Sequence, residues 1–310
     1  MLEGRLGAVG DAEGDHLPDD LPPVVDAHLH LFPDRVFEAL WNWFDTHAWP
    51  IRYRLHADEV VEFQRQRGVR HMVALTYSHK PGMARSLNRW LADGYAACDD
   101  ISALGAVLPG EPDARAIVEE AFELGLAGIK LHCHVQCFAP DDPAVAEVYQ
   151  ACADAGRPLV MHAGREPKSP AYKCDPHALC SVERIEDVLR DHPRLKLSIP
   201  HLGADEFDGY AELLDRYDNL WLDTTMTMAG FLPGPDPELR PLLAAHADRL
   251  MYGTDFPNLP FAWDRELKRI VAQELPPDAL EALLGGTALA LFKQPLNDVA
   301  TALSAAPPTP

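Results

Sequence analysis

Short runs of consecutive apolar residues alternate along the chain with longer runs in which apolar residues recur at helical spacing. Unbroken apolar runs of this length are typical of strands that are buried on both faces. Eight of them occur, at residues 24–30, 72–76, 103–108, 128–132, 159–162, 195–199, 220–223 and 250–253. Helical spacing lies between them, for example at residues 57–67, 114–124, 143–155, 182–191, 210–217 and 239–246. The pattern therefore predicts strands that alternate with helices.

Buried strands that are connected through helices pair in parallel, and eight such units can close into a (β/α)₈ barrel (TIM barrel) of roughly 250 residues. An open doubly wound sheet is the competing architecture. It would need a glycine-rich phosphate-binding turn after an early strand, whereas the first strand here ends in His28-Leu-His30. We therefore predict an α/β fold with one barrel domain over residues 23–294.

Both ends of the chain differ from the barrel in composition. Residues 1–20 contain six acidic side chains and one arginine, and residues 305–310 read Ala-Ala-Pro-Pro-Thr-Pro. Such segments have little apolar surface to bury. We expect an acidic disordered tail over residues 1–22 and a loose C-terminal tail over residues 295–310.

Charge and composition narrow the choice of partners. The chain has 48 acidic and 27 basic side chains, a formal net charge of −21, and no dense cluster of lysine and arginine. Nucleic acids and anionic membranes attract basic clusters, so we expect neither as a partner and expect a small-molecule substrate instead. The first residues lack a secretory pattern, and the chain has six cysteines in 310 residues. These features favour a cytoplasmic protein with reduced thiols.

Titratable side chains gather where the predicted strands end. The carboxyl ends of barrel strands form the rim at which barrel enzymes build their active sites. Because alternate residues of a strand share a face, the imidazoles of His28 and His30 point the same way and are placed to chelate a transition metal. The ends of later strands add Lys130, His162, His201 and Asp255. Donors of these types at one rim indicate a metal site.

The motifs that contain these residues resemble the amidohydrolase superfamily, specifically its amidohydrolase-related branch of metal-dependent barrel hydrolases and decarboxylases. The matching motifs are Asp-Ala-His-Leu-His from residue 26, Gly-Ile-Lys-Leu-His from residue 128, Met-His-Ala-Gly from residue 161, Pro-His-Leu-Gly from residue 200 and Gly-Thr-Asp-Phe-Pro from residue 253. The segment from Leu284 to Phe292 resembles the closing helix of the family, although Thr287 stands where asparagine is usual. The resemblance extends from about residue 24 to residue 292, and the order and spacing of its motifs are highly specific.

The resemblance implies a catalytic metal on four side chains, His28, His30, His162 and Asp255. His201 would polarise the substrate and shuttle a proton, or would bind a second metal. Lys130 matches the position of a carboxylated lysine that bridges two metals in some relatives, but His132 lies on the same face and competes for that space. We expect one divalent ion, zinc, with manganese and a second ion as the alternatives.

The residue types suit hydrolysis. A bound metal lowers the pKa of water to roughly 7, so hydroxide is available at neutral pH. Asp255 would orient this nucleophile and carry its proton to the leaving group, and His201 would stabilise the developing oxyanion. We therefore predict a metal-dependent hydrolase of an amide, ester or lactone bond in a small molecule. The alternatives are a non-oxidative decarboxylase of an aromatic or unsaturated carboxylic acid, and a metal-stabilised ligand-binding barrel without turnover.

Two further groups bear on the substrate. Arg165 follows the fifth strand and could hold a substrate carboxylate in its planar fork, although an ordinary solvated loop is the alternative. Aromatic residues crowd the insertion after the first strand, at Trp41, Trp43, Phe44 and Trp49. They could line an apolar pocket, form a homodimer contact or pack in the core.

Cysteines follow the fourth and fifth strands, at Cys133, Cys137, Cys174 and Cys180. These two loops are neighbours in a barrel, so a thiolate metal site or a disulfide is open to the chain. The spacings are not the tight pairs of structural zinc modules. We expect free thiols.

Overall fold

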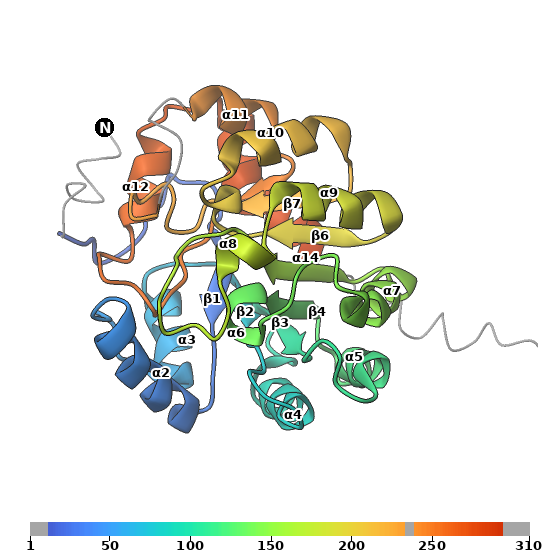
Figure 1. The fold of residues 1–310 in the computed structure, drawn as a ribbon. Coiled ribbons are helices and arrows are strands. Elements are labelled where there is room, and N and C mark those ends of the chain that lie inside the picture. Colours follow the sequence, from blue (N-terminus) through green and yellow to red (C-terminus); the bar gives the residue numbers. More distant parts are fainter. Residues whose placement is uncertain (1–11, 233–238, 294–310) are drawn as a thin grey trace, which may run out of the picture.

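The structure is a computed structural model that describes residues 12–232 and 239–293. Eight parallel strands form one sheet in the order β1 to β8, and helices surround it (Figure 1). The strands are β1 (Val25–His30), β2 (His71–Leu75), β3 (Ile101–Ala106), β4 (Gly128–His132), β5 (Pro158–His162), β6 (Lys196–Ile199), β7 (Leu220–Asp223) and β8 (Leu250–Met251). This is the (β/α)₈ barrel that the sequence predicts.

Helices connect the strands and cover the outside of the barrel. The longer ones are α2 (Asp34–His47), α3 (Ala57–Gln66), α4 (Ala84–Tyr95), α5 (Ala114–Glu123), α7 (Ala146–Ala155), α9 (Val182–Asp191), α10 (Phe207–Arg216) and α12 (Arg265–Val271). The shorter ones are α6 (Cys133–Gln136), η1 (Pro143–Val145), α8 (Pro176–Leu179), η2 (His201–Gly203), α11 (Arg240–Ala245), α13 (Pro277–Glu281), η3 (Ala282–Gly286) and α14 (Thr287–Phe292). α9 has the predicted bounds because Ser181 caps its first turn, with the hydroxyl of Ser181 accepting from the amide of Arg184.

Hydrogen bonds between β1 and the segment that begins at the end of β8 close the barrel. The amide of Ala27 donates to the carbonyl of Tyr252 at 3.0 Å, and the amide of His30 donates to that of Phe256 at 2.8 Å. In the opposite direction the amide of Asp255 donates to the carbonyl of His28 at 2.8 Å. The closure therefore brings Asp255 beside the end of β1.

The interior of the barrel is filled with apolar side chains below the rim. Val25, Val73, Val160 and Met251 from four strands pack with Phe292 of α14, and each of them is nearly or fully buried. A second and larger apolar core lies between the strands and the surrounding helices. The packed interior makes the barrel a rigid support for the side chains at its rim.

Part of the expected N-terminal tail packs against the barrel. The side chain of Leu17 is buried, and the amide of Gly14 donates to the carboxylate of Asp264 at 2.7 Å. The ammonium of Lys268, which is buried in α12, donates to the carbonyl of Ala12. These partners satisfy buried polar groups, which explains why the acidic composition does not keep residues 12–17 apart from the domain. Residues 1–11 and 295–310 of the expected tails lie outside the described residues.

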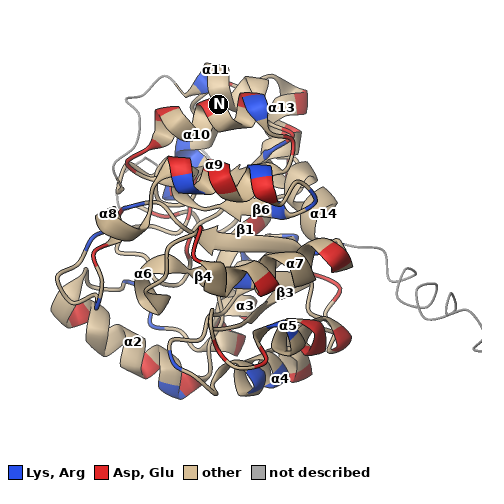
Figure 2. Ribbon diagram, turned by 45° about the vertical axis from the view of Figure 1, so that its right-hand side comes forward, with Lys and Arg blue, Asp and Glu red and all other residues tan. Residues whose placement is uncertain are grey.

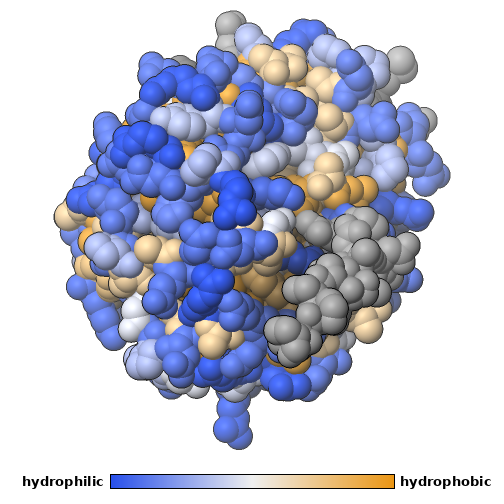
Figure 3. Space-filling model, turned by 90° about the vertical axis from the view of Figure 1, so that its right-hand side faces the viewer, coloured by the Kyte–Doolittle hydropathy of each residue, from blue (hydrophilic) through white to orange (hydrophobic). Residues whose placement is uncertain are grey.

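Charged residues lie mainly on the outer helices, and the strands contain few of them (Figure 2). The face of the molecule in Figure 3 is mostly hydrophilic, with separate hydrophobic patches. In the part of the chain that the structure describes, no helix is both long and apolar enough to span a membrane.

Candidate metal centre

Three donor atoms converge at the rim of the barrel. The Nε2 atoms of His28 and His30 are 3.3 Å apart, and Oδ1 of Asp255 lies 3.4 Å from the first and 2.9 Å from the second. Two ligands of a tetrahedral zinc ion are about 3.4 Å apart, because each lies roughly 2.1 Å from the ion. The three atoms therefore already have the spacing of ligands around one metal ion.

The local fold explains this convergence. His28 and His30 lie on the same face of β1, as strand alternation predicts. Asp26, on the same strand, accepts hydrogen bonds from the backbone amides of His28 and Thr254, both at 3.1 Å, and from the hydroxyl of Thr254 at 2.6 Å. Asp26 thus ties β1 to the segment that contains Asp255 and does not contact an imidazole itself. Its burial raises its pKa to about 7.

Asp223, at the end of β7, is a functional candidate that the sequence analysis missed. Its Oδ2 lies 2.9 Å from Nδ1 of His28, and its Oδ1 accepts from the backbone amide of His201 at 3.1 Å. A carboxylate can only accept, so His28 carries its proton on Nδ1 and directs the lone pair of Nε2 toward His30 and Asp255. Carboxylate–histidine pairs of this kind orient metal ligands in many proteins. The position of Asp223 at a strand end, like that of the other site residues, was the signal that could have identified it.

Burial and neighbouring charges set the protonation of these groups. Burial, with the charge of Lys130, holds the pKa of His28 well below its ordinary value. Burial alone would raise the pKa of Asp255, but the hydrogen bond from His30 and the nearby imidazoles lower it to about 2. The carboxylate of Asp255 is therefore ionised at neutral pH and His28 is neutral, which are the states that bind metals.

Lys130 lies at the predicted position on β4, in the same small pocket as the three donors. It is buried, and its Nζ has no hydrogen-bond partner among the described residues. Burial lowers the pKa of Lys130 to about 8, while the charges of Asp223 and Asp255 oppose the shift.

His201 follows β6 and also lines this pocket. Its Nδ1 lies 2.9 Å from the carbonyl oxygen of Thr225, which can only accept, so this nitrogen carries the proton. Its Nε2 lies 3.1 Å from Nδ1 of His162. Burial lowers the pKa of His201, so the ring is an acceptor at Nε2 at neutral pH. Both ring nitrogens of His201 thus have partners.

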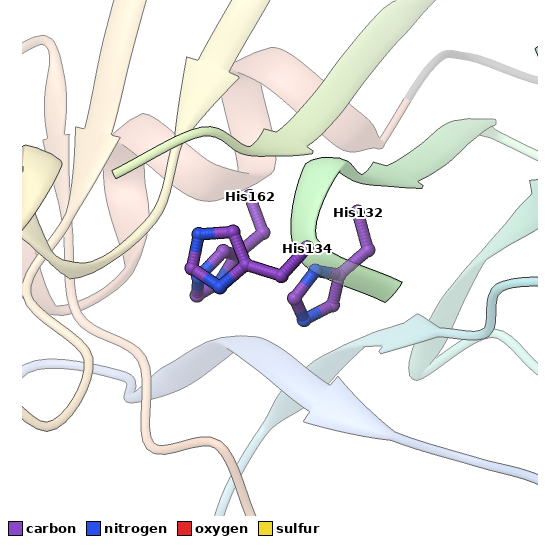
Figure 4. A group of neighbouring side chains, drawn as sticks. All are labelled: His132, His134 and His162. Carbon is purple, nitrogen blue, oxygen red and sulfur yellow. The ribbon is translucent and has the colours of Figure 1, made fainter. Parts of the chain in front are cut away.

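His162, the fourth predicted ligand, groups with other histidines. One donor atom each of His132, His134 and His162 lies within 4.8 Å of the other two, and this group is separate from that of His28, His30 and Asp255. Figure 4 shows the three imidazoles side by side at the ends of β4 and β5. His134 was not among the residues that the sequence analysis singled out.

Arg165, which the sequence offered as a partner for a substrate carboxylate, forms two ion pairs in the structure. Its Nη2 lies 2.9 Å from the carboxylate of Asp205, and its Nε lies 3.5 Å from that of Glu206. Both partners belong to the segment between β6 and α10, which the sequence pattern does not connect to Arg165. A substrate carboxylate would therefore have to compete with these two carboxylates for the guanidinium of Arg165.

Two adjoining cavities open at this rim. The one that contains the metal donors has a volume of about 50 Å³, and its neighbour has a volume of about 370 Å³. They share four lining residues, which are Phe44, Tyr77, His132 and Tyr172. The larger cavity is mainly apolar and is further lined by residues of α2, including Leu40 and Trp43. Residues of the aromatic insertion therefore line a pocket, which is the first of the three roles that the sequence allowed for them.

Two other outcomes concern the aromatic residues and the thiols. Trp43 stacks on Tyr172 with 5.5 Å between ring centroids, whereas Trp41 packs between Phe37 and His56, away from both cavities. The six cysteines all lie within the described residues and are free thiols.

Comparison with known proteins places the chain in one family. The profile of the amidohydrolase family matches residues 25–294, which is most of the chain. The chain belongs to the amidohydrolase family. A search of curated protein sequences finds no match.

Solved structures with the same fold include enzymes of two reaction types. 5-Carboxyvanillate decarboxylase from Sphingomonas paucimobilis is 19% identical over 88% of this chain and 99% of its own, with a TM-score of 0.63. A candidate 2-pyrone-4,6-dicarboxylic acid hydrolase from Pseudomonas putida is 19% identical over 87% and 97%, with a TM-score of 0.59. 5-Carboxyvanillate decarboxylase from Novosphingobium aromaticivorans, complexed with manganese and a nitrobenzoic acid, is 15% identical over 88% and 96%, with a TM-score of 0.61. Identities this low establish the shared fold and leave the reaction to be argued from the site.

Proposed function

We propose that the chain is a metal-dependent hydrolase that cleaves an amide, ester or lactone bond in a small molecule. The observation that carries the proposal is the convergence of donor atoms from His28, His30 and Asp255 within 3.4 Å of one another. Membership of the amidohydrolase family supports an enzyme. The polar pocket at the rim, with two further titratable groups, supports catalysis over a metal that only stabilises the fold.

The donor set fits a divalent transition metal, and we propose zinc, with manganese as the alternative. Catalytic zinc sites commonly use three protein ligands and leave a fourth position open. His28, His30 and Asp255 supply three such ligands, and we propose His162, which lines the same small cavity, as a further ligand. When bound, the ion would act as a Lewis acid and would make water a nucleophile at neutral pH.

The residues around the donors divide the remaining tasks. The ionised carboxylate of Asp255 orients the attacking water and accepts its proton. His201 accepts a proton at Nε2 and returns it to the leaving group, because its Nδ1–H is already held by the carbonyl of Thr225. Lys130, with a pKa of about 8, is mostly protonated at pH 7 and stabilises negative charge that develops on the substrate.

A second ion on Lys130 and His201 is the family's two-metal arrangement. For Lys130 the buried, unpartnered Nζ is compatible with carboxylation. For His201 both ring nitrogens have partners, and Nε2 must give up its hydrogen bond with His162 both to bind a metal and to accept a proton. We propose His201 as the proton carrier of the arrangement with one metal.

The cavity beside the metal donors supports a proposal for the substrate class. Its volume of about 370 Å³ and its aromatic wall suit a small molecule with an apolar or aromatic body. His79 and Lys173 also line it, and Lys173 could hold a substrate carboxylate that Arg165 is not free to bind.

Decarboxylation of an aromatic carboxylic acid is the second candidate. The observation that favours it is the same aromatic wall, with Phe44, Tyr77 and Tyr172 shared between the two cavities. The two 5-carboxyvanillate decarboxylases among the structural neighbours, one of them with manganese, add support. In that reaction the protonated Lys130 or His201 would deliver a proton to carbon.

The two reactions differ in the fate of water. The protein should be loaded with zinc or manganese and given panels of amides, esters, lactones and aromatic carboxylic acids in water enriched in oxygen-18. Product that contains the label without carbon dioxide supports hydrolysis, and carbon dioxide with unlabelled product supports decarboxylation. If neither panel reacts with either ion, and the His28→Ala/His30→Ala variant binds as much metal as the wild type, the proposal is wrong.

A further inference from the structure

Four of the six cysteines lie on the two loops that follow β4 and β5, and the proposed hydrolysis uses none of them. The short helices of these loops, α6 and α8, contact each other at the rim of the barrel (Figure 1). The thiols interact in pairs across the loops, Cys133 with Cys180 and Cys137 with Cys174. Among the described residues, no cysteine belongs to a group of three donors spaced as metal ligands. The thiols are therefore arranged as pairs and not as a metal site.

The two pairs differ in their access to solvent. Cys133 and Cys180 are fully or almost fully buried, with exposed fractions of 0% and 1%. Cys137 is exposed, and Cys174 is partly exposed. Cysteine reactions with dissolved reagents depend on this access. The pair of Cys137 and Cys174 is therefore the one that a reagent in water can reach.

One backbone oxygen holds both thiols of the accessible pair. The carbonyl oxygen of His134 lies 3.6 Å from Sγ of Cys137 and 3.3 Å from Sγ of Cys174, and either thiol can donate to it. Two sulfurs that contact the same oxygen are near neighbours, and these two also interact directly with each other. They need only approach from this contact to the roughly 2.0 Å of a disulfide bond.

The backbone at Cys137 also favours a role for its thiol. Cys137 ends α6 in the left-handed conformation, with φ 55° and ψ 54°, and its amide donates to the carbonyl of Cys133 at 2.8 Å. Glycine and asparagine are the usual residues at such helix ends, because the left-handed conformation costs other residues roughly 1–2 kcal/mol. A cysteine at this position is therefore unexpected unless its side chain has a use.

We propose that Cys137 and Cys174 form a reversible oxidation site, which hydrogen peroxide converts to a disulfide. In the first step the thiolate of Cys137 attacks one peroxide oxygen, the O–O bond breaks, and the hydroxide that leaves takes up the thiol proton as water. Cys137 is then a sulfenic acid. In the second step the sulfur of Cys174 attacks that of Cys137, the S–O bond breaks, and the hydroxyl leaves as water with the proton of Cys174. The two sulfurs lose two electrons, which reduce one peroxide to two water molecules, and a dithiol reductant reverses the bond.

The surroundings of the two thiols assign the order of the steps. Cys137 is the more exposed, so peroxide meets it first. Burial and the hydrogen bond with Cys137 raise the pKa of Cys174 to about 12, so Cys174 stays protonated at neutral pH and is not the first nucleophile. In the sulfenic acid Cys137 is no longer a thiolate, which removes the part of this shift that arises from its charge. Cys174 can then release its proton as it attacks.

A bond between these sulfurs would connect two parts of the wall of the large cavity. His134 and Val135 of α6 line this cavity, and so do Tyr172 and Lys173, which directly precede Cys174. Tyr172 lines the small cavity as well. Oxidation would therefore fix the spacing of two segments that face a bound substrate. Only this consequence rests on the proposed function, because the oxidation itself needs no metal and no substrate.

Hydrogen peroxide is the probe for this site. Reduced full-length protein should be treated with a small excess of peroxide, denatured in the presence of a thiol-alkylating reagent and mapped by peptide mass. We expect a peptide pair linked through Cys137 and Cys174, with the other four cysteines alkylated. Dithiothreitol should restore all six thiols. Hydrogen exchange of the backbone in residues 171–174 should slow in the oxidised protein.

Three variants make the result decisive. Cys137→Gly suits the left-handed backbone and removes the first nucleophile, so Cys174 should stay reduced. Cys174→Ser removes the second thiol, so Cys137 should stop at the sulfenic acid, which dimedone traps. Cys98 is also partly exposed but lies between α4 and β3, at the opposite end of the barrel, so Cys98→Ser should form the same linkage as the wild type. Thermal melting of each variant checks that it folds.

The proposal is overturned if peroxide leaves all six thiols reduced, or if the linkage joins other cysteines or two chains. It is also overturned if Cys174→Ser yields no trapped sulfenic acid at Cys137. Unchanged hydrogen exchange in a protein that carries the linkage would refute its effect on the cavity wall. Failure of the proposed function is a different result, in which reduced, metal-loaded protein is inactive on every substrate while peroxide still forms the linkage.

Discussion

Asp223→Asn tests the inference that a carboxylate at the end of β7 prepares His28 for a metal. The two oxygens of Asp223 face two donors, Nδ1–H of His28 and the backbone amide of His201. Asparagine has one acceptor oxygen and one amino group, so a donor would face a donor at one of these contacts. If the oxygen stays with the backbone amide, His28 must move its proton to Nε2 and loses the lone pair that binds metal.

The expected loss follows from the role of Asp223. Removal of an outer partner of a metal-bound histidine typically lowers metal affinity tenfold to a hundredfold, or by about 1.4–2.7 kcal/mol. The metal-free protein should lose little stability, because burial already raises the pKa of Asp223 and penalises its charge. Zinc affinity can be measured by competition with a chromophoric chelator, and stability by melting in the presence of EDTA.

Asp264→Asn is the matched control. Asp264 is also buried and also has two partners, an ion pair with Lys268 at 2.8 Å and a hydrogen bond from the amide of Gly14 at 2.7 Å. It should lower the melting temperature and leave zinc affinity unchanged. If Asp223→Asn binds zinc as tightly as the wild type, or if both variants weaken binding equally, the orienting role of Asp223 is refuted.

Three other predictions concern the pocket and its charges. The ordinary pKa of lysine is 10.5 and that of buried Lys130 is about 8, so the unfolded chain binds more protons between these values and stability should rise with pH in that window. Lys130→Met should therefore increase the free energy of unfolding in EDTA at pH 7 by up to about 3 kcal/mol, at 1.36 kcal/mol per pKa unit, and the gain should vanish above about pH 10.5. Equal gains in urea titrations at pH 7 and above about pH 10.5 would contradict this. Trp43→Ala removes the ring that stacks on Tyr172 and should raise KM for aromatic substrates about tenfold with a smaller change in kcat, whereas a loss confined to kcat would place Trp43 elsewhere. Arg165→Ala should change KM less than about threefold, because Asp205 and Glu206 already hold the guanidinium, and a tenfold rise would return Arg165 to substrate binding.

The fold could be predicted because its signals are local. Unbroken apolar runs marked the strands, but they misled at the ends of β3 and β8. These strands end at Ala106 and Met251, whereas the predicted ranges continued to residues 108 and 253. Beyond Met251 the chain leaves the ladder with β7 and still bonds to β1, which turns Asp255 toward His28. A turn of this kind depends on contacts between distant segments, such as that of Asp26 with Thr254, which no local pattern contains.

For the site, the sequence could predict which residues lie at the rim of the barrel. Strand alternation placed His28, His30 and Lys130 there, and the same argument would have included Asp223. The hydrogen-bond and ion-pair partners of these residues could not be predicted in this way, because they lie on loops from different parts of the chain. Arg165 forms ion pairs with Asp205 and Glu206, and His162 forms a hydrogen bond with His201, and strand-end positions specify neither.

The central claim is that His28, His30 and Asp255 hold a catalytic metal ion. Its most direct test is anomalous diffraction from crystals of the protein soaked in zinc. The account predicts a peak about 2.0–2.2 Å from Nε2 of His28, Nε2 of His30 and a carboxylate oxygen of Asp255. Zinc bound only at other residues, or no peak at these three donors in fully soaked crystals, would contradict it.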